Sequence, residues 1–128
     1  MKFGFHHAAI KAADFQKTLD FYLNGLGFKM VRDWSTPEKS ACMIDIGDGG
    51  MLEIFSGGTT EAHEEEKWLH LAFSVDDPDA AYEAAIAAGA TSHIAPKDMV
   101  IQAETPLPVR LAFVRGLNGE LLEFFHEK

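Results

Sequence analysis

The sequence predicts an α+β fold built from two βαβββ modules, and two internal matches indicate this organisation. His7–Asp14 (HAAIKAAD) matches His70–Asp77 (HLAFSVDD) at an offset of 63 residues, with histidine over histidine and aspartate over aspartate. Gly49–Phe55 matches Gly119–Phe125 at an offset of 70, with Glu53 over Glu123. The same order of a His-bearing strand, a helix, further strands and a Glu-bearing strand therefore occurs twice, as in a duplicated module.

The two modules are expected at residues 1–57 and 67–128 of a single domain that spans residues 1–128. Between them lies SGGTTEAHEEEK, which is polar, acidic and glycine-containing, as is typical of a linker.

In the first module, alternating apolar residues predict a strand at 3–11. A helix is expected at 14–24 with Asp14 as its N-cap, because apolar residues then form one stripe: Phe15, Leu19, Tyr22 and Leu23. Three strands should follow, at 28–34, 41–46 and 51–55, the last two joined by a DGG turn.

The second module begins with a predicted strand at 68–75 and continues with an alanine-rich helix at 78–88. Asp77 suits the N-cap of this helix and Pro78 its first turn. Three prolines, Pro96, Pro106 and Pro108, interrupt 91–108, so only a short strand at 98–103 is expected there. The final pair of strands is predicted at 109–115 and 120–126.

Composition narrows the class of protein. The chain has 128 residues, of which 47% are apolar and 24% charged, as in ordinary globular proteins. Its net charge of −9 disfavours nucleic acid and anionic membranes as partners. No apolar run is long enough for a transmembrane helix and the N-terminus does not look like a signal peptide, so a cytoplasmic location is expected. The single cysteine, Cys42, is expected in the core.

Four side chains could bind a metal ion. Strand alternation places His70 on the opposite face from the apolar residues of 68–75, while Glu53 and Glu123 lie mid-strand between apolar neighbours. A carboxylate there is costly unless it is paired or coordinated. With His7, these residues could converge around a pseudo-twofold axis as a His₂Glu₂ set, which suits Zn, Ni, Co, Fe or Mn.

The remaining histidines are not expected to be ligands. By alternation His6 should face away from His7 and His126 away from Glu123, His63 lies in the acidic linker, and His93 follows the second helix.

The segments HAAIKAADF (7–15), LDFY (19–22), GLGF (25–28), LEIF (52–55), HLAFSVDD (70–77) and NGELLEF (118–124) carry a family resemblance. The chain resembles the vicinal-oxygen-chelate superfamily, which includes glyoxalase I, extradiol dioxygenases, fosfomycin-resistance thiol transferases, methylmalonyl-CoA epimerase and bleomycin-binding proteins. The resemblance implies that the modules pair into a curved mixed sheet with the helices on its outer face. It also implies metal ligation by His7, Glu53, His70 and Glu123.

This order of ligands is similar to that of bacterial glyoxalase I, which implies one divalent metal per site, with nickel or cobalt favoured over zinc, manganese or iron. The implied reaction isomerises a thiol hemithioacetal, or a related small α-hydroxycarbonyl substrate, through an enediolate. Glu123 is the first candidate for the base and Glu53 the second. The alternatives are a dioxygenase, a thiol transferase, an epimerase, or a metal-free small-molecule-binding resistance protein.

By the same resemblance the protein should be a homodimer whose active sites are shared. His7 and Glu53 would come from one subunit, and His70 and Glu123 from the other. Two local departures leave the thiol open: Arg115–Gly119 replaces the usual D-P-D-G turn, and SGG follows Phe55 where an Asn-containing stretch is common.

Overall fold

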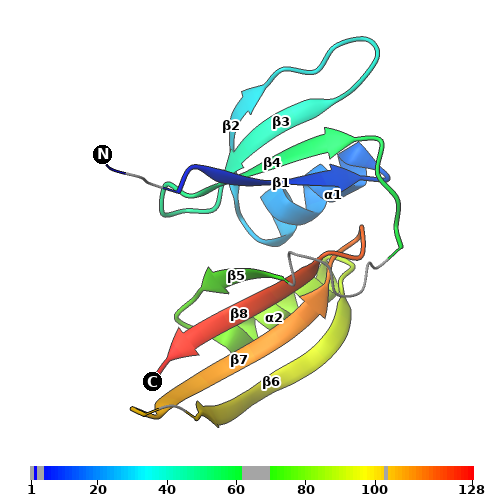
Figure 1. Ribbon diagram of the computed structural model, residues 1–128. Helices are drawn as coiled ribbons and strands as arrows, with labels where there is room; N and C mark the ends of the chain where they lie inside the picture. Colours follow the sequence, from blue (N-terminus) through cyan, green and yellow to red (C-terminus); the bar gives the residue numbers. More distant parts are fainter. Residues whose placement is uncertain (1, 3–4, 62–69, 103) are drawn as a thin grey trace. The chain divides into compact units, whose positions relative to one another are not determined.

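The structure is a computed structural model that describes residue 2 and residues 5–61, 70–102 and 104–128 (Figure 1). The chain divides into two compact units, Met1–Glu61 (unit 1) and Ala62–Lys128 (unit 2). Each unit contains a helix and a four-stranded mixed sheet in βαβββ order, which confirms the predicted α+β class. No helix in the described part of the chain has the length and apolar character to cross a bilayer.

Unit 1 has the strand order β1-β4-β3-β2. The parallel pair β1–β4 is flanked by the antiparallel pairs β4–β3 and β3–β2. Its elements are β1 (His7–Ala12), α1 (Phe15–Asp20), the π-helix η1 (Phe21–Gly25), β2 (Lys29–Asp33), β3 (Ala41–Asp45) and β4 (Met51–Ser56).

β1 is shorter than the strand expected at 3–11. It begins at His7, so Phe5 and His6 precede it, while residues 3–4 lie outside the described residues.

The first helix begins where the sequence indicates and then changes form. The Asp14 carboxylate accepts a hydrogen bond from the backbone N–H of Lys17 at 3.1 Å, which is the predicted N-cap. From Phe21 the helix widens, and the Leu26 N–H donates to the Phe21 carbonyl five residues back. Both Phe21 and Tyr22 are buried there.

In unit 1 the helix α1 covers one face of the sheet (Figure 1). Alternate residues of β3 and β4 are fully buried, namely Cys42, Ile44, Leu52 and Ile54. Glu53 lies between two of them and therefore points to the opposite face. The predicted core position of Cys42 is confirmed.

Unit 2 has the strand order β5-β8-β7-β6, the same arrangement as unit 1. Its elements are β5 (Leu71–Ser74), α2 (Pro78–Ala87), β6 (Thr91–Ile101), β7 (Leu107–Arg115) and β8 (Leu121–Glu127). The Asp77 carboxylate accepts from the Ala80 N–H at 3.1 Å, so the predicted N-cap of α2 is confirmed. Residues 68–69, which begin the predicted strand 68–75, lie outside the described residues.

The short strand expected at 98–103 is wrong. β6 runs for 11 residues and passes through Pro96. Pro96 lies in an irregularity of the β6–β7 register between Ile94 and Lys97, and β6 is an edge strand. Edge strands and bulges are where a sheet tolerates a residue without a backbone N–H, so proline did not end this strand.

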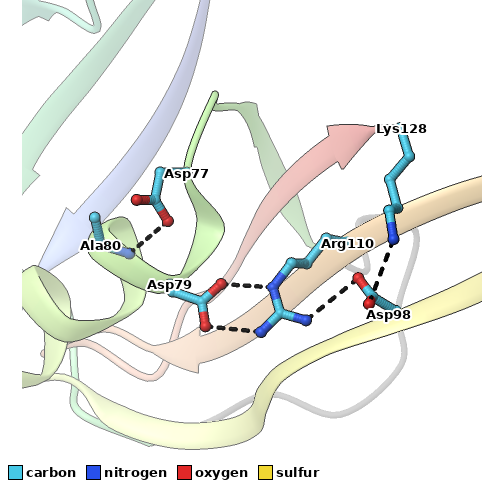
Figure 2. A network of polar contacts seen from close by, with 6 residues as sticks. All are labelled: Asp77, Asp79, Ala80, Asp98, Arg110 and Lys128. Carbon is cyan, nitrogen blue, oxygen red and sulfur yellow. Dashed lines mark hydrogen bonds and ion pairs between the residues drawn. The ribbon is translucent and has the colours of Figure 1, made fainter.

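A cluster of charged residues joins α2 to the sheet of unit 2 (Figure 2). Arg110 of β7 binds both carboxylate oxygens of Asp79 on α2, one of them at 2.8 Å. Its third nitrogen donates to Asp98 of β6 at 3.2 Å, and Lys128 lies 3.4 Å from the same carboxylate. Arg110 therefore holds α2 against β6 and β7.

Candidate metal centre

In unit 1 the parallel pairing of β1 and β4 brings His7 and Glu53 together. Glu53 lies in register with Ala9, which is two residues after His7 and therefore on the same face of the sheet. The small Ala9 leaves room for the larger side chains on either side. The His7 Nε2 and Glu53 Oε1 atoms are 3.4 Å apart, and the Glu53 side chain is only 13% exposed.

Unit 2 repeats this arrangement with other residues. Glu123 of β8 lies in register with Ala72 of β5, which is two residues after His70. The His70 Nε2 and Glu123 Oε1 atoms are again 3.4 Å apart. In both units the glutamate lies mid-strand, on the face opposite the buried apolar residues that flank it.

The spacing within each pair suits two ligands of one metal ion. Donors about 2.1 Å from an ion, at angles between octahedral and tetrahedral values, are about 3.0–3.4 Å apart. Among the described residues, no group of three or more His, Cys, Asp or Glu forms a metal-sized cluster. Each unit thus supplies two donors, and the convergence of all four on one ion stays a prediction.

Glu123 is the more buried of the two glutamates, with 8% of the residue exposed. Burial raises the pKa of its carboxyl group above the ordinary value, and the nearby His70 opposes this rise. Phe113 is the apolar neighbour in register with Glu123 and contributes to its burial. The Phe113 ring meets the His70 ring edge-on, with the ring centroids 5.4 Å apart. In unit 1 the equivalent neighbour of Glu53 is Met43.

One sequence expectation about the other histidines is wrong. His6 was expected to face away from His7, but their Nδ1 atoms lie 2.9 Å apart and the rings meet edge-on. The reason is that β1 begins at His7, so strand alternation does not extend to His6. This contact involves Nδ1 of His7 and leaves its Nε2 towards Glu53.

Of the remaining histidines, the two that the structure describes, His93 and His126, are not paired with Glu53 or Glu123. His126 faces away from Glu123 as predicted, with its Nδ1 3.0 Å from the Val75 carbonyl oxygen. The ring of His93, on β6, meets the ring of Phe113 edge-on, with the two ring centroids 6.3 Å apart. His63 falls outside the described residues.

This placement of His93 beside Phe113 was missed by sequence reasoning. The proline-rich segment that follows His93 concealed β6, and without that strand His93 had no assigned face. An unbroken run of β-compatible residues before Pro96 was the available signal.

The family of the chain follows from comparison with known proteins. The profile of the Glyoxalase/Bleomycin resistance protein/Dioxygenase superfamily matches residues 4–124, so the chain belongs to this superfamily. A lactoylglutathione lyase of Neisseria meningitidis is 28% identical over 131 residues, which cover 95% of this chain and 89% of the relative.

Solved structures agree on the fold. A glyoxalase family protein from Enterococcus faecalis has a TM-score of 0.72 at 26% identity, covering 95% of this chain and 96% of that one. A point mutant of the fosfomycin resistance protein FosX of Listeria monocytogenes, in complex with Mn(II) and 1S,2S-dihydroxypropylphosphonic acid, also has a TM-score of 0.72. At 18% identity, over 100% of this chain and 95% of that one, FosX shows the shared fold alone.

Proposed function

We propose that the protein is a metal-dependent enzyme of the glyoxalase I type, which isomerises the hemithioacetal of a thiol and a 2-oxoaldehyde. The observation that carries this proposal is the His–Glu pair that recurs in the same register, with the same 3.4 Å spacing, in both units. The similarity to a protein named lactoylglutathione lyase supports it.

The proposed ligands of the metal ion are His7, Glu53, His70 and Glu123. Two imidazoles and two carboxylates suit a borderline divalent ion, with nickel or cobalt favoured and zinc, manganese or iron as alternatives. The donor chemistry and the spacing within each pair fit such an ion. When bound, it would supply Lewis acidity that stabilises the adjacent oxygens of an enediolate.

The residues of the chain would then move the proton. Glu123 would take the proton from the hydroxyl-bearing carbon and return it to the former carbonyl carbon. The hydroxyl proton would pass to the former carbonyl oxygen, so that the hemithioacetal becomes a thioester of a 2-hydroxy acid. The more buried Glu123 is the first candidate for this role and Glu53 the second. A general base within reach of a carbon acid contributes about 10²–10⁴-fold to the rate.

The site is proposed to be shared between the subunits of a homodimer. Each unit holds one His–Glu pair, so two units must combine to supply four ligands. In the proposed arrangement, His7 and Glu53 of one subunit face His70 and Glu123 of the other. The cytoplasm is the proposed location, because a lone buried cysteine suits a reducing compartment.

Two measurements test the proposed function. Metal content is determined on the purified protein, which is then stripped and reloaded with Ni, Co, Zn, Mn or Fe(II). Each form is assayed for thioester formation from methylglyoxal with glutathione and with other thiols. We expect one ion per His₂Glu₂ set and metal-dependent turnover. Metal binding without turnover, but with ring cleavage of a catechol or opening of an epoxide, would replace this proposal with another activity of the superfamily.

A further inference from the structure

A β-bulge recurs at equivalent positions of the two sheets. In unit 1 the β2–β3 register shifts between Met30 and Arg32, so that Val31 is an extra residue. In unit 2 the β6–β7 register shifts between Ser92 and Ile94, and His93 is the extra residue. Each bulge lies in the edge strand, β2 or β6, and one strand, β3 or β7, separates it from the glutamate-bearing strand β4 or β8. A bulge redirects the extra side chain, and bulges are frequent next to active sites.

The bulge of unit 2 places His93 in a row with the proposed ligands. The His93 ring lies 6.3 Å from the ring of Phe113, whose other neighbour is His70 at 5.4 Å. Phe113 is also in register with Glu123. One face of this sheet therefore carries the His70–Glu123 pair, then an apolar ring, then a second imidazole.

Basic residues accompany His93 on this face. Lys97 is in register with Leu111, and Leu111, Phe113 and Arg115 alternate along β7 towards the same side. Arg115 donates a hydrogen bond to the Gly119 carbonyl at 2.9 Å. In a chain of net charge −9, the side chains near Phe113 away from Glu123 thus include an imidazole and two cations, beside the apolar Ile94 and Leu111.

We propose that His93 is a specificity-determining residue that hydrogen-bonds an anionic group, such as a carboxylate, at the far end of the substrate. The chelating oxygens of that substrate lie at His70 and Glu123, and its middle crosses the ring of Phe113. This inference rests on the proposed function, because it takes the reacting end of the substrate to be at the His70–Glu123 pair.

Two hydroxamates that differ in one group provide the test. N-hydroxyglutaramate chelates a metal through two adjacent oxygens and ends in a carboxylate, whereas N-hydroxypentanamide ends in a methyl group. Their dissociation constants are measured by calorimetry on the full-length, metal-loaded protein. Three variants are compared with the wild type: His93→Val, His93→Gln and His126→Gln.

His93→Val introduces the residue that the equivalent bulge carries in unit 1, so the bulge should persist. His93→Gln keeps a hydrogen-bond donor at the same place. His126→Gln is the matched control, because His126 lies on the opposite face of the same sheet.

We expect the wild type to bind the acid at least about tenfold more tightly than the neutral probe, the usual effect of a hydrogen bond to a charged group. The preference is the dissociation constant of the neutral probe divided by that of the acid. This ratio should fall to about one in His93→Val, return in part in His93→Gln and remain unchanged in His126→Gln. If both probes bind the metal-loaded wild type but His93→Val keeps the full preference, or the wild type has none, the role of His93 is overturned and the proposed function stands. If the protein takes up no divalent ion, both fail together.

Discussion

Glu53 and Glu123 occupy equivalent register positions, yet their neighbours differ. Across the next strand Glu53 faces Met43, whereas Glu123 faces Phe113. The pKa of the Glu123 carboxyl group is raised by burial, and His70 opposes the rise. The two modules therefore place equivalent carboxylates in different surroundings. The proposed division of roles, with Glu53 as a ligand and Glu123 as ligand and base, relies on this difference.

Replacing Glu123 should affect chemistry more than metal binding. The Glu123→Gln variant keeps three of the proposed ligands and an amide oxygen, so its metal affinity should fall modestly. Its turnover should fall by roughly 10² or more, because the general base is lost. Turnover is measured at saturating metal, since empty sites would imitate lost chemistry.

Glu53→Gln is the matched control for this comparison. It removes the equivalent carboxylate from unit 1 and, at saturating metal, should cost less turnover than Glu123→Gln. A fully metallated Glu123→Gln protein that turns over at the wild-type rate would exclude Glu123 as the base.

Cys42 should be unreactive in the folded protein. Burial, helped by the negative charge of Asp33, raises the pKa of its thiol from 9.0 to about 11. A rise of two pH units lowers the thiolate fraction near neutral pH about 100-fold. Alkylation by iodoacetamide at pH 8 should therefore be about 100-fold slower in the native protein than in urea. Equal rates would show that the thiol is accessible.

The same shift makes stability depend on pH. The folded state binds the thiol proton of Cys42 more tightly than the unfolded state does. The protonated thiol therefore contributes to the free energy of unfolding fully below pH 9, and this contribution is lost as the pH rises towards 11. The difference in unfolding free energy between the wild type and Cys42→Ala should shrink over this range in urea titrations. A constant difference would show that the thiol does not titrate differently in the two states.

At the scale of the elements, local signals predicted where most helices and strands begin. Asp14 and Asp77 cap their helices as expected, because a side-chain oxygen that satisfies a free N–H is a local property. The full length of β6 was missed because of Pro96. Proline interrupts a central strand but is tolerated in an edge strand, and which strand lies at the edge is decided by the order of strands in the whole sheet. The π-helix Phe21–Gly25 was missed because neither its residue types nor their spacing mark a wider turn.

The contact between α2 and its sheet should depend on Arg110. Hydrogen bonds from Arg110 lower the pKa of both Asp79 and Asp98 below the ordinary 3.8. Their contribution to stability is present above pH 3.8 and is lost as the pH falls through the lowered values. The Arg110→Gln variant should therefore unfold more easily than the wild type at pH 7, and the difference should vanish in acid.

Arg32→Gln is the control for this prediction, because it removes the same charge from β2 of unit 1. Chemical denaturation of the three proteins from pH 7 downwards measures the effect. High salt should weaken it, since these groups are partly exposed to solvent. If Arg110→Gln and Arg32→Gln were equally stable at every pH, the cluster of Arg110, Asp79 and Asp98 would contribute nothing specific.

For the whole molecule, the proposed sharing of sites predicts a dimer. Sedimentation at micromolar concentration should give twice the mass of the chain. Removal of the metal by a chelator should weaken the dimer, because an ion held by both subunits stabilises their association. A monomer that keeps its bound metal would contradict the shared site.

The recurrence of His and Glu in the sequence identified the four residues that form the two His–Glu pairs, and each pair depends only on register within one module. The predicted convergence of all four on one ion stays a prediction. The contact between Phe113 and His93 could not be predicted in the same way. Their meeting requires β6, its bulge and the alignment of β7 with β8, which arise from the folded sheet. Sequence repeats thus reveal what the modules share, whereas the differences between them emerge from the structure.

The repeated bulge bears on stereochemistry. A proposed site made from two copies of one frame would, by itself, accept a substrate in two orientations related by the pseudo-twofold axis. In the proposed site Val31 and His93 would remove this equivalence, since one copy of the bulge carries an apolar side chain and the other an imidazole. A substrate with one anionic end would then bind in a single orientation. The same face of its reacting carbon would always meet Glu123, so a single enantiomer of the hydroxy acid would form.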